Sequence, residues 1–348
     1  MTETLAATAG PTLKEQGGAL LAHAAGYASH RAIAIGLRSG LLEALAHDPA
    51  GATAEELAER LDFDPFYVWV WCRAALAAGV CERDGDRFAL APHVATLLLD
   101  RSSPAYAGGV FNVLEQPEMF GRFEVNLASG ERLWWDECSP DWIAGVAGTG
   151  TPFYTRLVPG GLGQVPGLAE RLAAGGLIVD SACGAGVGLV RLAQHFPARR
   201  LFGVDGDAHS IELARARVAD AGLADRVRLI CSPLEEMAVD EPAALVVNNI
   251  SMHECREIDR VAERVLATLE PGGWFVISDF PFPDTDEGLR SVPGQVMGAI
   301  QFFEAQIDDQ LLPRAYYDTL LARHGFTDPG SVSLTPMHAL TWGRRPLG

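Results

Sequence analysis

The stretch Leu177–Gly188 is the first part of the sequence whose residue types and spacing could do chemistry. Three apolar residues lead to Asp180, small residues follow in the pattern Asp-x-Ala-x-Gly-x-Gly-x-Gly, and apolar residues at helical spacing continue to Phe196. This order predicts a strand, a tight turn and a helix. Glycines let the backbone turn sharply and approach a ligand, and the first N–H groups of the helix are free to bind it. We therefore expect a small-molecule site at this turn.

The spacing of the turn narrows the class of ligand. A dinucleotide site requires Gly-x-Gly-x-x-Gly, but the sixth position counted from Gly184 is Leu189, and no Gly-Lys-Ser/Thr follows for a phosphate loop. Asp180 would repel a pyrophosphate but suits a ligand that carries an ammonium group. A second apolar strand ends in Asp205, which can accept hydrogen bonds from two ribose hydroxyls or, alternatively, cap the next helix.

The stretch from Asp180 to Gly188 resembles the first motif of the class I S-adenosylmethionine-dependent methyltransferases. In that family the acid faces the methionyl amine, and Ala182 replaces the family's first glycine. The resemblance implies S-adenosylmethionine as cofactor. After the third strand, Ser232-Pro233 replaces the family's Gly-Asp, so the Ser232 hydroxyl or the backbone must meet the adenine amine while Leu234 packs on the ring. The implied cofactor-binding residues are Asp180, Ala182, Gly184, Gly186, Asp205, Gly206, Ser232, Leu234 and Asn248.

A second polar stretch, Asn248–Cys255, follows an apolar strand. The O-methyltransferases that this chain resembles carry His-Asp-Trp here, with the histidine as general base, and this chain has His253-Glu254-Cys255. The resemblance implies that His253 removes the acceptor's proton, with Glu254 beside it, and that Asp279 orients the imidazole. The alternatives are that His253 caps the helix near Arg256 and that Asp279 caps a loop.

The chemistry favours an acidic hydroxyl as the acceptor. A sulfonium methyl is already activated, so alignment, worth about 7–11 kcal/mol, and a positioned base, worth roughly a hundred- to ten-thousand-fold, must supply the catalysis. Imidazole with a pKa near ~6.5 is about 3.5 units short of a phenol near ~10. An aliphatic alcohol is far less acidic. We therefore expect methyl transfer to a phenol or enol of a small specialised metabolite.

The acceptor's pocket is expected in the aromatic-rich region 105–170 and a later helix. Most aromatic residues there, including Trp134 and Trp135, are expected in the core or an interface. In the family, helices between the two domains cover the substrate. The residues predicted to contact the acceptor are Trp142, Phe153, Tyr154, Phe303 and Glu304.

The alternation of strands and helices after Leu177 predicts a parallel sheet with helices on both faces and a ligand beyond the carboxyl ends of the strands. Residues 331–342 predict a closing hairpin. Before them, the capping box Thr53–Glu56, the helix start Asp64-Pro65 and a hairpin around Gly85 predict a winged helix. The expected fold is α/β: a Rossmann-like seven-stranded methyltransferase domain (171–348), a helical substrate lid (109–170) and a mostly helical winged-helix domain (1–108). Residues 1 to about 18 show no strong pattern.

Composition limits the partners. The formal net charge of −18 and a would-be reader helix, 66–73, with a single cation argue against nucleic acid. The family resemblance implies homodimerisation through the winged helix. The sequence shows no signal peptide and no membrane span, and its six cysteines lack Cys-x-x-Cys spacing. We therefore expect a cytoplasmic enzyme that acts on a small molecule.

Other functions remain open at this point. Some members of the superfamily bind a metal beside the same histidine and acid and methylate carbon or chelated oxygen. No second ligand at helical spacing follows His253-Glu254, and His338 and Asp279 could join only through folding, so the sequence predicts no metal site. The departures at Ala182, Pro233 and Cys255 leave room for cyclisation or other non-methyl chemistry. A ligand-sensing regulator is the non-enzymatic alternative.

Overall fold

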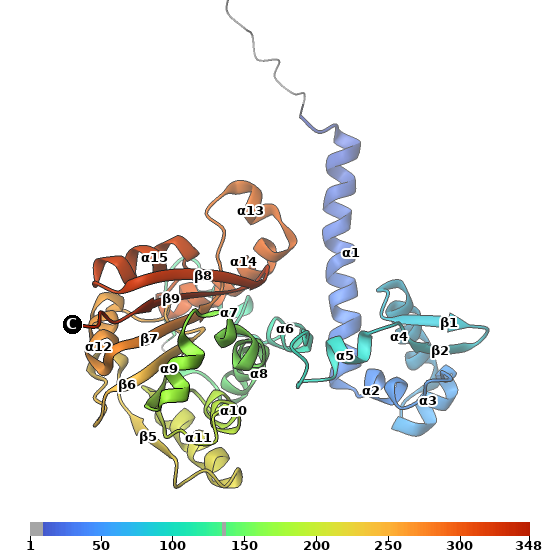
Figure 1. Cartoon of the computed structure of the whole chain (residues 1–348). Coiled ribbons are helices and arrows are strands. Elements are labelled where there is room, and N and C mark those ends of the chain that lie inside the picture. Colours follow the sequence, from blue (N-terminus) through green and yellow to red (C-terminus); the bar gives the residue numbers. More distant parts are fainter. Residues whose placement is uncertain (1–9, 134–136) are drawn as a thin grey trace, which may run out of the picture. The chain divides into compact units, whose positions relative to one another are not determined.

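The computed structural model describes residues 10–133 and 137–348 (Figure 1). The chain divides into two compact units, Met1–Asp100 and Arg101–Gly348. The sequence analysis placed the first boundary at residue 108, and the region expected to form a lid belongs to the second unit. Trp134 and Trp135 lie outside the described residues.

The first unit consists of helices followed by a hairpin. Its long first helix begins at Leu13, inside the stretch that was expected to lack structure, because Thr12 and Glu15 form a capping box. The Asp64 carboxylate accepts hydrogen bonds from the backbone N–H groups of Phe66 and Tyr67 and so caps the helix that begins at Pro65. The elements are α1 (Leu13–Arg38), α2 (Leu41–Ala46), α3 (Ala54–Leu61), α4 (Pro65–Ala77), β1 (Cys81–Asp84), β2 (Arg87–Leu90) and α5 (Val94–Leu98).

The core of this unit lies between α1, α2, α3 and α4. Leu42 and Leu57 are fully buried, and the indole N–H of Trp71 on α4 donates to the Ala32 carbonyl on α1 at 2.9 Å. Elsewhere the same helices expose large apolar side chains: Leu20, Leu21 and Tyr27 on α1, and Phe66, Tyr67 and Val70 on α4.

The second unit is built on a seven-stranded sheet with the strand order β5-β4-β3-β6-β7-β9-β8. The five neighbouring strands β5, β4, β3, β6 and β7 are parallel, and β9 pairs antiparallel with both β7 and β8. The predicted α/β fold is therefore confirmed. The strands are β3 (Leu177–Ser181), β4 (Leu201–Asp205), β5 (Val227–Cys231), β6 (Ala243–Asn249), β7 (Leu269–Asp279), β8 (Thr327–Thr335) and β9 (His338–Arg344).

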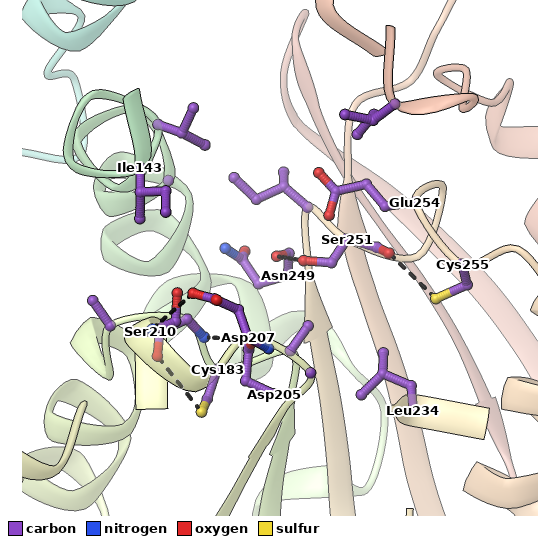
Figure 2. Close-up of a pocket in the computed structure, with 18 of the residues that line it drawn as sticks. Ile143, Cys183, Asp205, Asp207, Ser210, Leu234, Asn249, Ser251, Glu254 and Cys255 are labelled. Atoms are coloured by element: carbon purple, nitrogen blue, oxygen red, sulfur yellow. Dashed lines mark hydrogen bonds between the residues drawn. The ribbon is translucent and has the colours of Figure 1, made fainter. Parts of the chain in front are cut away.

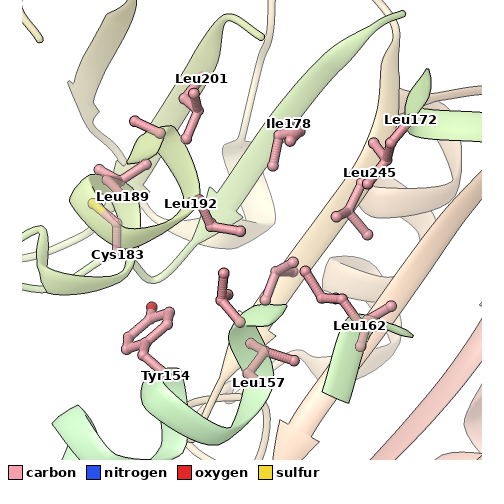
Figure 3. Packing of buried hydrophobic residues seen from close by; sticks show 14 of the residues in the cluster. Tyr154, Leu157, Leu162, Leu172, Ile178, Cys183, Leu189, Leu192, Leu201 and Leu245 are labelled. Atoms are coloured by element: carbon pink, nitrogen blue, oxygen red, sulfur yellow. The ribbon is translucent and has the colours of Figure 1, made fainter. Parts of the chain in front are cut away.

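Side chains of the central strands alternate between the two faces of the sheet, as strand geometry requires. Ile178 of β3 packs with Leu189 and Leu192 of α10 (Val187–His195), together with residues of α9 (Leu168–Ala174) and α11 (Ala208–Asp220) (Figure 3). Its neighbours Leu177 and Val179 join the opposite cluster, with residues of α12 (Ile258–Thr268) and α15 (Arg314–Arg323). Two apolar layers therefore hold the sheet and leave its carboxyl edge for polar residues.

Further helices accompany the sheet in this unit: α6 (Gly108–Val113), α7 (Gly121–Val125), α8 (Pro140–Arg156), α13 (Asp286–Arg290) and α14 (Val292–Glu304). Trp142 of α8 packs on Phe303 of α14 with ring centroids 4.2 Å apart, which joins segments far apart in sequence. In the described part of the chain, no helix has the length and hydropathy needed to cross a bilayer.

Candidate active site

The turn after β3 has the backbone path that its glycines predict. Ala182, Gly184 and Gly186 all have positive φ angles, of 65°, 49° and 79°. The left-handed conformation, which glycine adopts freely, is about 1–2 kcal/mol less favourable for alanine. The turn is therefore preserved at Ala182 with a strained backbone. A Cβ added to Gly184 would meet no atom within 4 Å, which shows open space beside that backbone.

Tyr154 and Asp180 form one buried unit. The Tyr154 hydroxyl lies 2.9 and 3.0 Å from the two carboxylate oxygens of Asp180 and donates to them, and Asp180 is fully buried. The ring of Tyr154 covers Gly188, where an added Cβ would lie 2.0 Å from it. The last glycine of the motif is therefore needed for this ring. Burial raises the pKa of Asp180 well above its usual value, against the effect of the Tyr154 hydrogen bond.

A cavity of about 670 Å³ opens at the carboxyl ends of β3, β4 and β6 (Figure 2). Asp205 is fixed at its wall, because its Oδ2 accepts the Gly184 N–H at 2.8 Å and its Oδ1 accepts the Asp207 N–H at 2.9 Å. Burial raises the pKa of Asp205, and these backbone hydrogen bonds oppose the shift. Five of the residues predicted to bind the cofactor line this cavity: Ala182, Gly184, Asp205, Gly206 and Leu234.

The other predicted cofactor residues lie behind or beside the cavity. Asp180 is covered by Tyr154, Gly186 packs against α11, and the Ser232 hydroxyl donates to the Pro233 carbonyl at 3.1 Å. Asn248 points inward, and its amide donates to the Ser181 carbonyl at 3.3 Å. Its neighbour Asn249 lines the cavity instead. Sequence analysis missed Asn249 because the two residues occupy alternate faces of one strand, and sequence spacing does not show which face is open.

Asn249 supplies a structural test of whether the implied cofactor fits. Its Oδ1 accepts the Ser278 hydroxyl at 2.7 Å, while its Nδ2 is buried without a hydrogen-bond partner. An amide donor left in this state favours a polar ligand in the cavity. In the same wall, the fixed carboxylate of Asp205 can accept hydrogen bonds from hydroxyls, the Asn249 amide can donate to a polar atom, and the apolar side chain of Leu234 can pack on a flat ring. These residues fit an amino-acid nucleoside.

His253 lies in the loop after β6 and is held by the end of β7. Its Nδ1 is 2.9 and 3.0 Å from the Asp279 carboxylate oxygens, and that carboxylate also accepts the Phe280 N–H and, at 2.6 Å, the Tyr317 hydroxyl. A carboxylate so placed keeps the proton on Nδ1 and leaves Nε2 as the basic atom. Tyr317, on α15, was missed because nothing in its local sequence distinguishes it from a core tyrosine.

Three carboxylates set the electrostatics around His253. Burial lowers its pKa, but the charge and hydrogen bond of Asp279 and the nearby charge of Glu304 outweigh burial and raise the pKa well above 6.5. Glu304, expected to contact the acceptor, has its Oε2 3.7 Å from His253 Nε2, and this buried oxygen has no hydrogen-bond partner. Burial also raises the pKa of Glu254 well above its usual value, with the charge of Glu304 adding to the effect.

A second, largely apolar cavity of about 360 Å³ contains His253 in its wall. It shares Val146, Ile250 and Glu254 with the first cavity. Of the residues predicted to contact the acceptor, Trp142, Phe153, Phe303 and Glu304 line this second cavity, whereas Tyr154 lines the first. Phe280, which packs edge-on against Phe153 at 4.8 Å, was missed.

Comparisons with known proteins agree with this geometry. Residues 178–273 match a family described as methyltransferase domain. The chain is 28% identical over 103 residues to a malonyl-[acyl-carrier protein] O-methyltransferase of Priestia megaterium, a match that spans 30% of this chain and only 36% of that relative. An O-methyltransferase family protein from Burkholderia thailandensis shares the fold with a TM-score of 0.69 at 18% identity, over 98% of this chain and 100% of the other. Human N-acetylserotonin methyltransferase, solved with S-adenosylmethionine, shares the fold with a TM-score of 0.68 at 13% identity. The alignment covers 97% of this chain and 100% of the human chain.

The matched domain, the sheet order and the cavity beside Asp205 indicate that the second unit contains a methyltransferase domain of the S-adenosylmethionine-dependent type. Within that class, the chain has over nearly its whole length the fold of the O-methyltransferases just described. The prediction of the family and of its cofactor is confirmed.

Proposed function

We propose that the protein transfers a methyl group from S-adenosylmethionine to the hydroxyl of a small aromatic acceptor, a phenol or enol of specialised metabolism, with His253 as the general base. The observation that carries the proposal is His253, hydrogen-bonded to the buried Asp279 carboxylate, in the wall of an apolar cavity that adjoins the cofactor cavity. An ionisable group in an apolar wall costs free energy when it is charged, so its presence there favours a functional role for the imidazole.

The protein's own residues supply binding and proton transfer. Asp205, Leu234 and Asn249 would hold the cofactor, which when bound supplies a methyl group on a sulfonium. His253 Nε2 takes the proton of the acceptor hydroxyl as its oxygen attacks, and Asp279 retains the proton on Nδ1. The imidazolium that forms is stabilised by Asp279 and Glu304, whose charges already raise the pKa of His253. A base of raised pKa is better matched to a phenol.

Methyl-labelled cofactor and a panel of phenols, enols and matching aliphatic alcohols provide the test. We expect label in the phenol or enol products as a methyl ether, identified by mass spectrometry. Label on carbon or nitrogen would overturn the O-transfer proposal. Conversion of substrate with no label in the product would point to the non-methyl chemistry considered above.

A second candidate function is metal-assisted methyl transfer to carbon or to a chelated oxygen. His253, Glu254 and Glu304 each offer one ligand atom, and these atoms lie within 4.8 Å of one another. The sequence analysis missed this grouping because Glu304 comes from a distant helix. An imidazole and two carboxylates suit a divalent ion such as Mn²⁺ or Fe²⁺.

A chelator separates the two candidates. If His253 acts as a base without metal, dialysis against EDTA followed by assay in metal-free buffer is expected to leave the rate within about twofold. Loss of activity that returns with one divalent ion, together with one equivalent of that ion in elemental analysis of the native protein, would favour the metal site.

We also propose that the first unit forms a homodimer and that the enzyme works in the cytoplasm. Leu20, Leu21, Phe66 and Tyr67 are 61–77% exposed, more apolar surface than isolated residues explain. All six cysteines, each within the described residues, are free thiols, as expected in a reducing compartment.

Light scattering tests the dimer. The wild type is expected at twice the chain mass, and Phe66→Lys with Tyr67→Lys is expected to shift the mass toward that of one chain. Val125→Lys, at an 82% exposed position of the other unit, serves as the control. A wild-type monomer would contradict the proposal.

A further inference from the structure

Arg156, at the end of α8, is a cation in the wall of the second cavity. Its Nε donates to His338 Nδ1 at 2.9 Å, its Nη1 donates to the Pro104 carbonyl at 3.0 Å, and its guanidinium lies 4.9 Å from the centroid of the Phe153 ring. Within residues 10–133 and 137–348, no carboxylate lies at ion-pair distance from it. It is also the one guanidinium or ammonium group among the described residues that line this cavity.

The residues that hold Arg156 are neutral. His338 is fully buried, and its Nε2 lies 2.8 Å from the Ser278 hydroxyl, which in turn donates to Asn249. Because Nδ1 accepts from Arg156, the ring carries its proton on Nε2 and donates it to Ser278. Burial, reinforced by the charge of Arg156, lowers the pKa of His338 to about 3, so the ring stays uncharged. The network fixes the guanidinium in place, and the described part of the chain supplies no negative charge to pair with it.

The charges of the cavity are divided between separate parts of its wall. His253, Glu254 and Glu304 form one group, and Arg156 forms the other. The rings of Phe153 and Phe280 connect the two groups through a series of contacts: Arg156 contacts Phe153, Phe153 contacts Phe280, and the ring centroids of Phe280 and His253 are 6.4 Å apart. A carboxylate on the ligand would be repelled by the glutamates and attracted by the guanidinium.

We propose that Arg156 binds a carboxylate on the acceptor, so that the acceptor is a hydroxylated aromatic acid with its hydroxyl at His253 and its carboxylate at Arg156. The flat ring between the two groups would lie along Phe153 and Phe280. The inference rests on the proposed function, because the hydroxyl end is placed by the role of His253. It adds an acidic group to the acceptor and assigns Arg156 as the residue that selects it.

Binding of matched acids and amides tests the assignment directly. Hydroxylated benzoate, phenylacetate and cinnamate, each beside its primary amide, are titrated calorimetrically into protein saturated with S-adenosylhomocysteine. We expect at least one acid to bind the wild type about tenfold or more tightly than its amide. Arg156→Gln is expected to weaken the acid roughly ten- to a hundredfold, the scale of a charge-assisted hydrogen bond, and to leave the amide unchanged.

Controls distinguish recognition from a structural role. Arg156→Lys keeps the charge and is expected to retain part of the preference for the acid. Arg191→Gln removes a guanidinium that lies outside the cavity and donates to the Val158 carbonyl. This variant is expected to bind the acid and the amide with wild-type affinity. All variants are compared for S-adenosylhomocysteine affinity and unfolding midpoint. The inference would be overturned if Arg156→Gln lost affinity for the acid and the amide equally. It would also be overturned if the wild type bound no acid more tightly than its amide.

The same panel separates this inference from the proposed reaction. Methyl transfer to neutral phenols with no preference for acids would leave the reaction standing and contradict the role of Arg156. Binding of acids that depends on Arg156, without methyl transfer to any hydroxyl, would support the carboxylate site and contradict the reaction.

Discussion

His253→Ala is expected to lower methyl transfer by roughly a hundred- to ten-thousand-fold, the contribution of a positioned general base. Affinity for S-adenosylhomocysteine is expected to stay within about twofold, because His253 lines the second cavity and is not among the described residues that line the first. Single-turnover rates with labelled cofactor measure the first effect and calorimetry the second. His195→Ala, at the exposed end of α10, is the matched control. Wild-type turnover in His253→Ala would assign the base elsewhere.

The pH dependence gives a second readout of the same residue. A base must be neutral before it accepts a proton, and the pKa of His253 is raised well above 6.5. The rate is therefore expected to rise with pH, with its midpoint above 6.5. Asp279→Asn removes one of the charges that raise this pKa, so the midpoint is expected to move to lower pH while the maximal rate falls. An unchanged midpoint would show that another group controls the rate.

Asp205→Ala is expected to weaken S-adenosylhomocysteine binding by roughly a hundredfold or more. Two hydrogen bonds from ribose hydroxyls to a carboxylate are worth about 1.5–3 kcal/mol each. The backbone N–H groups of Gly184 and Asp207 also lose their acceptor, so the turn loosens at the same position. Calorimetry measures the affinity, and the unfolding midpoint shows whether the fold is retained.

Two comparisons sharpen the test of Asp205. Asp205→Asn keeps one acceptor oxygen and is expected to fall between the wild type and Asp205→Ala. Asp220→Ala removes an exposed acid at the end of α11 and is expected to bind as the wild type does. Equal affinity in all four proteins would remove Asp205 from the cofactor site.

The sequence predicts the fold well, because the fold depends on local patterns. Asp205 and His253 each follow a buried apolar strand, and parallel strands bring their carboxyl ends to one edge of the sheet. Partners across the fold could not be predicted in the same way. Tyr154 covers Asp180 from a helix that ends before the strand carrying Asp180 begins, and Glu304 approaches His253 from a helix much later in the chain.

Single-residue errors have equally physical causes. Asn248 was chosen over Asn249 because alternation along a strand gives two faces without saying which one is open. Arg156 gave no signal at all, since an arginine in the last turn of a helix is ordinarily a solvated charge that favours the helix dipole. Only the fold shows that this guanidinium has a cavity beside it and, among the residues that the structure describes, no acid to pair with.

Helix α8 connects the two cavities. Phe153 and Tyr154 are consecutive residues, yet Phe153 lines the cavity beside His253, whereas Tyr154 lines the cavity beside Asp205 and donates a hydrogen bond to Asp180. A displacement of this segment therefore alters both binding sites together. With the cofactor and the acceptor bound as proposed, we expect their affinities to be linked, each changing the dissociation constant of the other by the same factor.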